Sequence, residues 1–217
     1  MADRQFVYIA DPMCSWCYGF APVIAELAER FRDQLGLQII MGGLRAGNIE
    51  PMTSKDKDYI RGAWTKVGEA TGQPFDPSFF DRDTFIYDTE PACRAVVTAR
   101  RLQPNMALPM MARVSRAFYA EARDMTAVDE IADVADEAGF DRATFTAAFT
   151  SPETQNETFR DFLIAQELGI RGFPTLIAGS EGTGYALITN GYRPLEDLAG
   201  PIDRWLAAGA PVTKTQS

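Results

Sequence analysis

Two cysteines near the amino terminus, Cys14 and Cys17, are the residues whose type and spacing best support chemistry. They follow an apolar run at residues 6–10 and precede a helical pattern that begins near Ala21. If Cys14 lies in the first turn of a helix, unpaired backbone N–H groups and the positive end of the helix dipole favour its thiolate. Cys17, one turn later, is then placed to resolve a mixed disulfide formed by Cys14. The pair therefore predicts thiol–disulfide exchange.

A zinc site and a pair of unreactive buried thiols are two other interpretations of this C-x-x-C pattern. A structural zinc site requires four ligands, whereas the sequence offers one further cysteine, Cys93, and no histidine, so a carboxylate would have to complete the set. Unreactive cysteine is common in protein cores. The position between an apolar run and a helix favours redox chemistry over both alternatives, and we expect no metal.

The composition is that of a globular protein and argues against two classes of partner. Of the 217 residues, 46% are hydrophobic and 24% charged, and the net charge is −9 with the basic side chains scattered. This charge disfavours nucleic acid and anionic membranes. Residues 1–10 lack the features of a secretory signal, and no apolar run reaches the length of a membrane span. We therefore expect a cytoplasmic protein. Because the cytoplasm is reducing, an isolated C-x-x-C there is more plausibly redox-catalytic than a structural disulfide.

The segments that flank the cysteines predict a parallel βαβ unit. Residues 6–10 are typical of a strand covered on both faces. A helical repeat follows, carried by Val23, Ile24, Leu27, Ala28 and Phe31. Pro22 falls inside this helix and should kink it because it lacks a backbone donor. Gly36 is expected to stop the helical segment, and residues 37–41 predict a second buried strand.

Most of the chain from residue 53 to 169 has helical spacing and helix start signals. The expected helices cover residues 55–70, 91–102, 106–122, 127–138, 141–149 and 152–168, with a short turn at 77–81. Pro109 lies early in its segment, so we expect that helix to begin later than its apolar pattern does. Residues 175–178 and 185–189 predict an antiparallel hairpin. A final helix at 194–208 precedes a frayed polar tail at 211–217.

This order of elements is that of a thioredoxin fold with a helical insertion, and particular residues resemble the DsbA family. The resemblance rests on C-S-W-C at residues 14–17, on Pro22 and on G-I-R-G-F-P-T at 169–175. The longer string D-P-M-C-S-W-C-Y-G-F at 11–20, with E-P-A-C-R-A-V-V at 90–97, resembles the cytoplasmic FrnE-like, protein-disulfide-isomerase-like branch. The resemblance covers nearly the whole chain.

The resemblance implies an α/β protein with a thioredoxin fold, βαβ then ββα, interrupted by a large all-helical insertion. Residues 1–52 and 170–217 would form a discontinuous thioredoxin-like domain. Residues 53–169 would form the insertion, which is not expected to be an independent domain.

The family also implies roles for individual residues. Cys14 would attack and Cys17 resolve, while Pro174 would follow a cis peptide bond and face the sulfurs. Phe173 would offer its backbone to pair briefly with a peptide substrate. On its own, G-F-P-T at 172–175 also fits an ordinary turn before a strand.

The remaining candidate site residues surround this pair. Trp16 and Thr175 complete the expected substrate-binding set, and Ser15 and Asp11 are supporting residues. Asp11 would relay a proton or orient a substrate, unless it is only a turn residue before Pro12.

The sequence departs from the periplasmic DsbA proteins, which carry proline and histidine between the cysteines. Here the pair is Ser15 and Trp16, and the chain has no histidine. The thiolate must then be favoured by the helix terminus, backbone donors, the Ser15 hydroxyl or a nearby arginine. We therefore predict a less oxidising disulfide, closer to that of a reductase or isomerase.

Further side chains have a structural and a functional interpretation. Cys93 is either a buried structural thiol or an auxiliary thiol near the site. Tyr18 and Phe20 either line an apolar substrate groove or pack into the core, whereas Trp16 is expected to be exposed. The aromatic and methionine-rich residues 106–119 are most simply helix core, with Met110, Met111 or Phe118 as candidates for a substrate cleft.

The leading function is a thiol–disulfide oxidoreductase that acts on protein or peptide disulfides. The first alternative is a glutathione-dependent isomerase or transferase that resembles 2-hydroxychromene-2-carboxylate isomerase and kappa-class glutathione transferases, which place serine where Cys14 stands. A second is a redox-switched binding protein without turnover. No tightly bound cofactor is expected, and glutathione is the candidate redox partner or substrate.

Overall fold

The computed structural model describes residues 4–182 and 184–207, and its centre is a four-stranded sheet. The strands are β1 (Gln5–Ala10), β2 (Gly36–Met41), β3 (Thr175–Ser180) and β4 (Gly184–Asn190), in the spatial order β2-β1-β3-β4. β1 and β2 are parallel, β3 is antiparallel to β1, and β4 is antiparallel to β3. The predicted βαβ unit and hairpin are both confirmed.

The two faces of the sheet are covered by different helices, as the alternation along β1 requires. Phe6 and Tyr8 share an apolar cluster with α1 (Ser15–Arg30) and α8 (Leu195–Ala207). Val7 and Ile9 belong to a separate cluster that includes Ala165 of α7 (Pro152–Glu167). Since both sets of β1 side chains are buried, the unbroken apolar run of this strand is explained.

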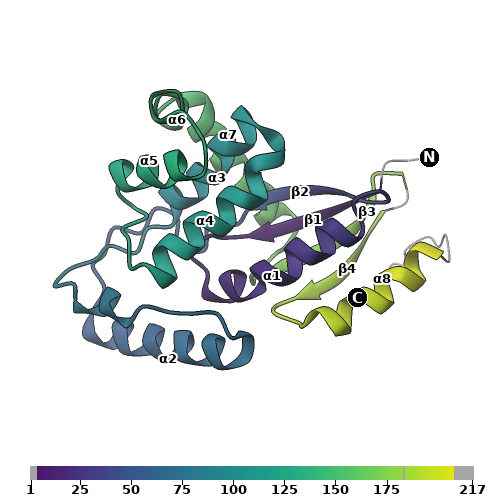
Figure 1. The fold of residues 1–217 in the computed structure, drawn as a ribbon, viewed down its shortest axis with the longest axis horizontal. Coiled ribbons are helices and arrows are strands. Elements are labelled where there is room, and N and C mark those ends of the chain that lie inside the picture. Colours follow the sequence, from purple (N-terminus) through teal and green to yellow (C-terminus); the bar gives the residue numbers. More distant parts are fainter. Residues whose placement is uncertain (1–3, 183, 208–217) are drawn as a thin grey trace.

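The chain between β2 and β3 is almost entirely helical, and most of these helices lie to the left of the strands in Figure 1. They are α2 (Ser54–Thr71), α3 (Glu90–Leu102), α4 (Ala107–Ala120), α5 (Val128–Glu137), α6 (Arg142–Phe149) and α7, with short 3₁₀ turns at Pro77–Asp81 and Pro104–Met106. Side chains of Thr53, Asp141 and Ser151 accept backbone hydrogen bonds at the starts of α2, α6 and α7. Caps of this type fix helix starts locally, which is why sequence predicted these boundaries closely.

A second apolar core lies among these helices, around the buried Trp64 of α2. The rings of Phe75, Phe79, Phe80, Phe118 and Tyr119 have centroids 4.7–6.0 Å from it. Aromatic pairs of this geometry contribute about 0.5–1.5 kcal/mol each beyond the area they bury. Met13 and Tyr18, next to the cysteines, also belong to this core. The turn that carries the cysteines is thus held from both cores. The division into domains at residues 53 and 169 stays a prediction.

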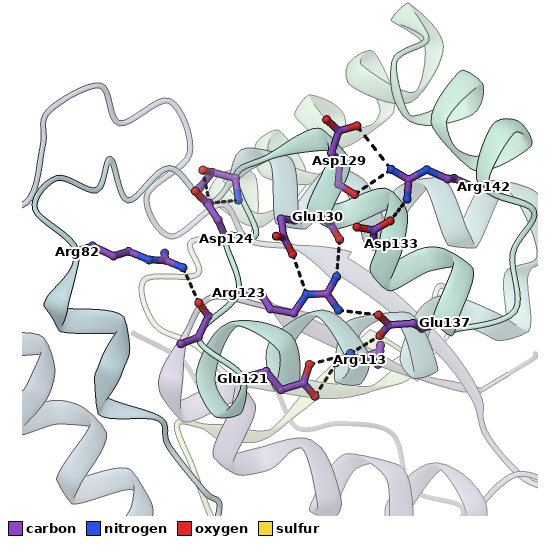
Figure 2. Close-up of polar contacts among 12 residues, drawn as sticks. Arg82, Arg113, Glu121, Arg123, Asp124, Asp129, Glu130, Asp133, Glu137 and Arg142 are labelled. Atoms are coloured by element: carbon purple, nitrogen blue, oxygen red, sulfur yellow. Dashed lines mark hydrogen bonds and ion pairs between the residues drawn. The ribbon is translucent and has the colours of Figure 1, made fainter.

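A network of ion pairs ties the end of α4 to α5 (Figure 2). Arg113 bonds Glu121 and Glu137, and Arg123 bonds Glu130 and the same Glu137. These side chains are partly exposed, so each pair contributes at most about 1 kcal/mol. The network fixes the connection between the two helices more than it adds stability.

Several expected boundaries were wrong. α1 begins at Ser15, earlier than the expected start near Ala21, and its first turns already bury Cys17, Tyr18 and Phe20. α4 begins at Ala107, one residue after the start of its expected segment, and Pro109 lies in its first turn, where a proline is tolerated because the first helical N–H groups have no intrahelical partner. β2 begins at Gly36, which was expected to be a stop. The predicted tail at 211–217 lies outside the described residues.

No helix in residues 4–182 and 184–207 is long and apolar enough to cross a membrane.

Candidate active site

Cys14 is the residue that caps the amino terminus of α1. Its backbone is extended (φ −95°, ψ 118°), and its N–H donates to the Asp11 carbonyl at 3.0 Å, which closes a turn after β1. Its carbonyl accepts the first hydrogen bond of the helix from the Tyr18 N–H. The sulfur is therefore attached where the helix dipole and free N–H groups favour negative charge. The expected placement of Cys14 at the helix start is confirmed.

Phe173 and Pro174 face this cysteine from the far end of the sequence. The peptide bond between them is cis, as predicted, and the carbonyl oxygen of Phe173 lies 3.8 Å from the Sγ of Cys14. Because β3 starts at the next residue and pairs with β1, the sheet itself fixes this approach. The Phe173 ring lies over Gly42, where a Cβ atom would come within 2.1 Å of Cζ.

Cys17 lies behind Cys14 and is fully buried, whereas Cys14 retains 7% exposure. All three cysteines are free thiols. Burial raises the pKa of Cys17 well above its usual value, and the neighbouring Cys14 adds to the rise. Tyr8 of β1 lies close to the same sulfur, and burial, together with its interactions with Cys17 and Cys14, raises the pKa of its phenol. Cys17 is thus a neutral thiol in the reduced protein, the state expected of a thiol that acts second.

Asp11 is a buried carboxylate directly before the cysteine turn. It accepts hydrogen bonds from the N–H groups of Met13 (2.8 Å) and Leu44 (2.7 Å) and from the thiol of Cys93 (3.5 Å). Burial raises the pKa of Asp11, although these donors oppose the rise. Asp11 therefore ties together the end of β1, the loop after β2 and α3, which goes beyond the turn role considered from sequence.

The other expected site residues differ in accessibility. Trp16 is half-buried, not exposed, because its ring packs against Tyr192 at a centroid distance of 5.9 Å. Ser15 is also half-buried, in the first turn of α1. Thr175 is buried, and its hydroxyl donates to the Gly172 carbonyl at 2.8 Å. Its side chain supports the loop before Pro174, so a substrate would meet it through the backbone.

The side chains for which the sequence allowed either a role in a substrate groove or a role in the core lie mostly in the core. Phe20 is fully buried beside Tyr8, and Tyr18 stacks on Tyr119 at 5.0 Å. Met110 and Phe118 are buried in the helical core. Met111 differs because it lines a cavity next to Cys17.

Sequence reasoning missed Tyr8 and Gly42 as site residues. Tyr8 lies within an apolar run, so its type did not mark it as a site residue. Because side chains alternate along a strand, Tyr8 points to the same face as Phe6, which α1 covers. No local signal marks Gly42 as a site residue, because its contact with Phe173 spans 131 positions of sequence.

Solved structures with the same fold cover nearly the whole chain. A structure from Nitrosomonas europaea, provisionally described as a protein disulfide isomerase, is 38% identical, with a TM-score of 0.88, over 96% of this chain and 100% of that one. The cytosolic disulfide reductase DsbM from Pseudomonas aeruginosa is 27% identical, with a TM-score of 0.72, over 94% of this chain and 96% of that one. DsbM has also been solved with GSH.

Among curated proteins, the ClpXP adapter protein SpxH from Halalkalibacterium halodurans is 20% identical over 171 residues. The match covers 77% of this chain and 56% of that protein, so the chain spans little more than half the length of this relative. The family model described as a DSBA-like thioredoxin domain matches residues 7–203, which include Cys14, Cys17 and Pro174. The chain therefore belongs to the DsbA-like thioredoxin-domain family.

Proposed function

We propose that this protein is a thiol–disulfide oxidoreductase that acts on protein or peptide disulfides, with Cys14 attacking and Cys17 resolving. The observation that carries the proposal is the 3.8 Å approach of the Phe173 carbonyl to the Sγ of Cys14. It places a backbone acceptor beside the more accessible of the two sulfurs, so an extended peptide can pair there while its own sulfur meets Cys14.

The reaction proceeds in two displacements. The Cys14 thiolate attacks one sulfur of the substrate disulfide; a new S–S bond forms, the old one breaks, and the leaving thiolate takes a proton. Cys17 then loses its proton and attacks the Cys14 sulfur, which releases the second substrate thiol and leaves a Cys14–Cys17 disulfide. Two electrons pass from the protein dithiol to the substrate, and two equivalents of a small thiol restore the dithiol.

Glutathione is the small thiol we propose for this last step, since the related DsbM, 25% identical in its GSH-containing structure, has been solved with it. We propose no tightly bound cofactor, because the two sulfurs carry both electrons. We also propose a cytoplasmic setting: DsbM is described as cytosolic, and a glutathione pool there keeps thiols reduced. Trp16, at the rim of the site against Tyr192, is the proposed side-chain contact with a substrate.

Turnover of a fluorogenic disulfide-bonded peptide with excess glutathione tests the proposal. Cys14→Ser should abolish turnover, whereas Cys17→Ser should accumulate a mixed disulfide on Cys14 that mass spectrometry detects. Cys93→Ala is the matched control and should keep turnover within about twofold, because the Cys93 thiol lies outside the C-x-x-C pair and donates its hydrogen bond to Asp11. Equal turnover by the wild type and Cys14→Ser would refute the assignment.

The same variants separate the two alternatives. A glutathione-dependent isomerase or transferase would retain its activity in Cys14→Ser and require glutathione. A redox-switched binding protein would form the Cys14–Cys17 disulfide only once per protein molecule. The presence of Cys14 and Cys17 at the start of α1 favours thiol–disulfide exchange over these two alternative functions.

A further inference from the structure

The hydroxyl of Tyr8 is a buried donor that lacks a hydrogen-bond partner. Tyr8 is fully buried, and its hydroxyl oxygen has no such partner among residues 4–182 and 184–207. Most buried hydroxyls do have one, because an unsatisfied polar group in the interior costs free energy. The buried Tyr87 follows this rule, since its hydroxyl donates to the Met13 carbonyl at 2.7 Å. The exception at Tyr8 therefore points to a partner that exists in another state of the protein.

The side chain beside this hydroxyl is the second cysteine of the C-x-x-C pair. Tyr8 of β1 and Cys17 of α1 are both fully buried, belong to the same apolar cluster and line the same cavity. The ring of Phe20 packs on Tyr8 at a centroid distance of 5.9 Å and fixes its position. Burial, and after it the interaction with Cys17, raises the pKa of the Tyr8 phenol. The phenol thus keeps its proton and stays a donor.

The charge of Cys17 decides whether it accepts this hydrogen bond. In the reduced protein Cys17 is a neutral thiol, and the sulfur of a thiol is a weak acceptor. A thiolate accepts strongly, because hydrogen bonds to charged groups are shorter and stronger than neutral ones. Cys17 becomes a thiolate when it attacks Cys14, and again when glutathione attacks Cys14 and expels it. A donor fixed beside the developing charge stabilises that transition state without reorganisation.

We propose that Tyr8 is a further catalytic residue, whose hydroxyl donates a hydrogen bond to the Cys17 sulfur when that sulfur becomes a thiolate. This inference rests on the proposed function, because it requires Cys17 to act as nucleophile and as leaving group. Tyr8 keeps its own proton throughout, and the proton of Cys17 passes to water. The electrons follow the two displacements already described, and none passes through the tyrosine ring. Tyr8 lowers the barrier by stabilising charge alone.

Tyr8→Phe removes the hydroxyl, keeps the ring and tests the proposal in both directions of exchange. Release of thionitrobenzoate from a mixed disulfide on Cys14 should slow by about threefold to tenfold at pH 7. The loss of the hydrogen bond lowers the thiolate fraction of Cys17, and the greater nucleophilicity of the remaining thiolate offsets part of that loss. Reduction of the Cys14–Cys17 disulfide by glutathione should slow similarly. Tyr59→Phe, at an exposed position of α2, is the matched control and should keep both rates.

The equilibrium between dithiol and disulfide separates this role from a structural one. In glutathione buffers at pH 7 the equilibrium constant of Tyr8→Phe should stay within about twofold of the wild type, because Cys17 is uncharged in both reduced proteins. Unchanged rates, or a shift of the equilibrium as large as the change in rate, would overturn the proposal. A wild type that releases no thionitrobenzoate would refute the resolving role of Cys17, and this inference with it. Equal release by the wild type and Tyr8→Phe would refute the role of Tyr8 alone.

Discussion

The Oδ2 atom of Asp11 lies 3.5 Å from the Sγ of Cys93, and both side chains are buried. The contact joins the turn before the active-site cysteines to the start of α3. Burial raises the pKa of Cys93 well above its usual value, and the negative charge of Asp11 raises it further. Cys93 is therefore a neutral thiol that donates to a carboxylate, the structural role considered from sequence.

This relationship predicts how Cys93 affects stability at high pH. A thiol whose pKa is raised in the folded state stabilises the protein fully below its unfolded pKa of about 8.5, and this contribution is lost as pH rises toward the folded value. The unfolding free energy of the reduced wild type should therefore fall with pH above about 8.5. In Cys93→Ala the fall should be shallower by about 1.4 kcal/mol per pH unit. Urea unfolding at pH 8, 9 and 10 measures both slopes, and parallel profiles would contradict the prediction.

Asp11→Ala should destabilise the protein by about 2–4 kcal/mol. The substitution leaves the buried N–H groups of Met13 and Leu44 without an acceptor, and each such group costs about 1–3 kcal/mol. Relief of a buried charge offsets part of this cost. Asp83→Ala, at an exposed position, is the matched control and should stay within about 0.5 kcal/mol of the wild type. Urea unfolding at pH 7 compares the three proteins; equal effects of the two variants would mean that Asp11 does not organise the turn.

The second displacement should accelerate with pH. Since burial raises the pKa of Cys17 well above its usual value, only a small fraction is thiolate near pH 7, and that fraction grows about tenfold per pH unit. A mixed disulfide between Cys14 and thionitrobenzoate should therefore release its chromophore about tenfold faster at pH 8 than at pH 7. Stopped-flow absorbance measures the rate, with Cys17→Ser as the control that should not release. A rate independent of pH would instead indicate that a neighbouring group removes the Cys17 proton.

The fold could be predicted from sequence where the signals are local. The capping residues Asp141 and Ser151 placed helix starts to within one or two residues, and unbroken apolar runs placed buried strands. The apolar repeat of α1 alone placed its start too late, near Ala21, whereas the position of the cysteines indicated a start next to Cys14, which is observed.

The site could be predicted only in part. The positions of Cys14 and Pro174 followed from the spacing and the family resemblance. Other contacts between distant segments could not be predicted: the Trp16 ring is half-buried because Tyr192, far along the chain, packs on it. The environment of the Tyr8 hydroxyl likewise depends on how α1 and α4 meet, which no local pattern encodes.

Gly42 should be required for exchange because the Phe173 ring occupies the space of its missing side chain. A Cβ atom at this position would lie 2.1 Å from Cζ of Phe173, so Gly42→Ala must displace the ring and with it the carbonyl that lies beside Cys14. A displacement of this kind should slow peptide-disulfide turnover by about tenfold to a hundredfold. Gly62→Ala is the matched control: no atom lies within 4 Å of its added methyl group, and alanine favours the helix, so turnover should be unchanged.

A double variant shows whether Gly42 acts through Phe173. Phe173→Ala removes the ring with which the new methyl group would collide, so adding Gly42→Ala to it should change turnover by less than about twofold. The combined loss would then be far smaller than the product of the two single losses. If the two effects multiply, Gly42 contributes to exchange by some route other than its contact with Phe173, and the proposed positioning of the carbonyl by this glycine is wrong.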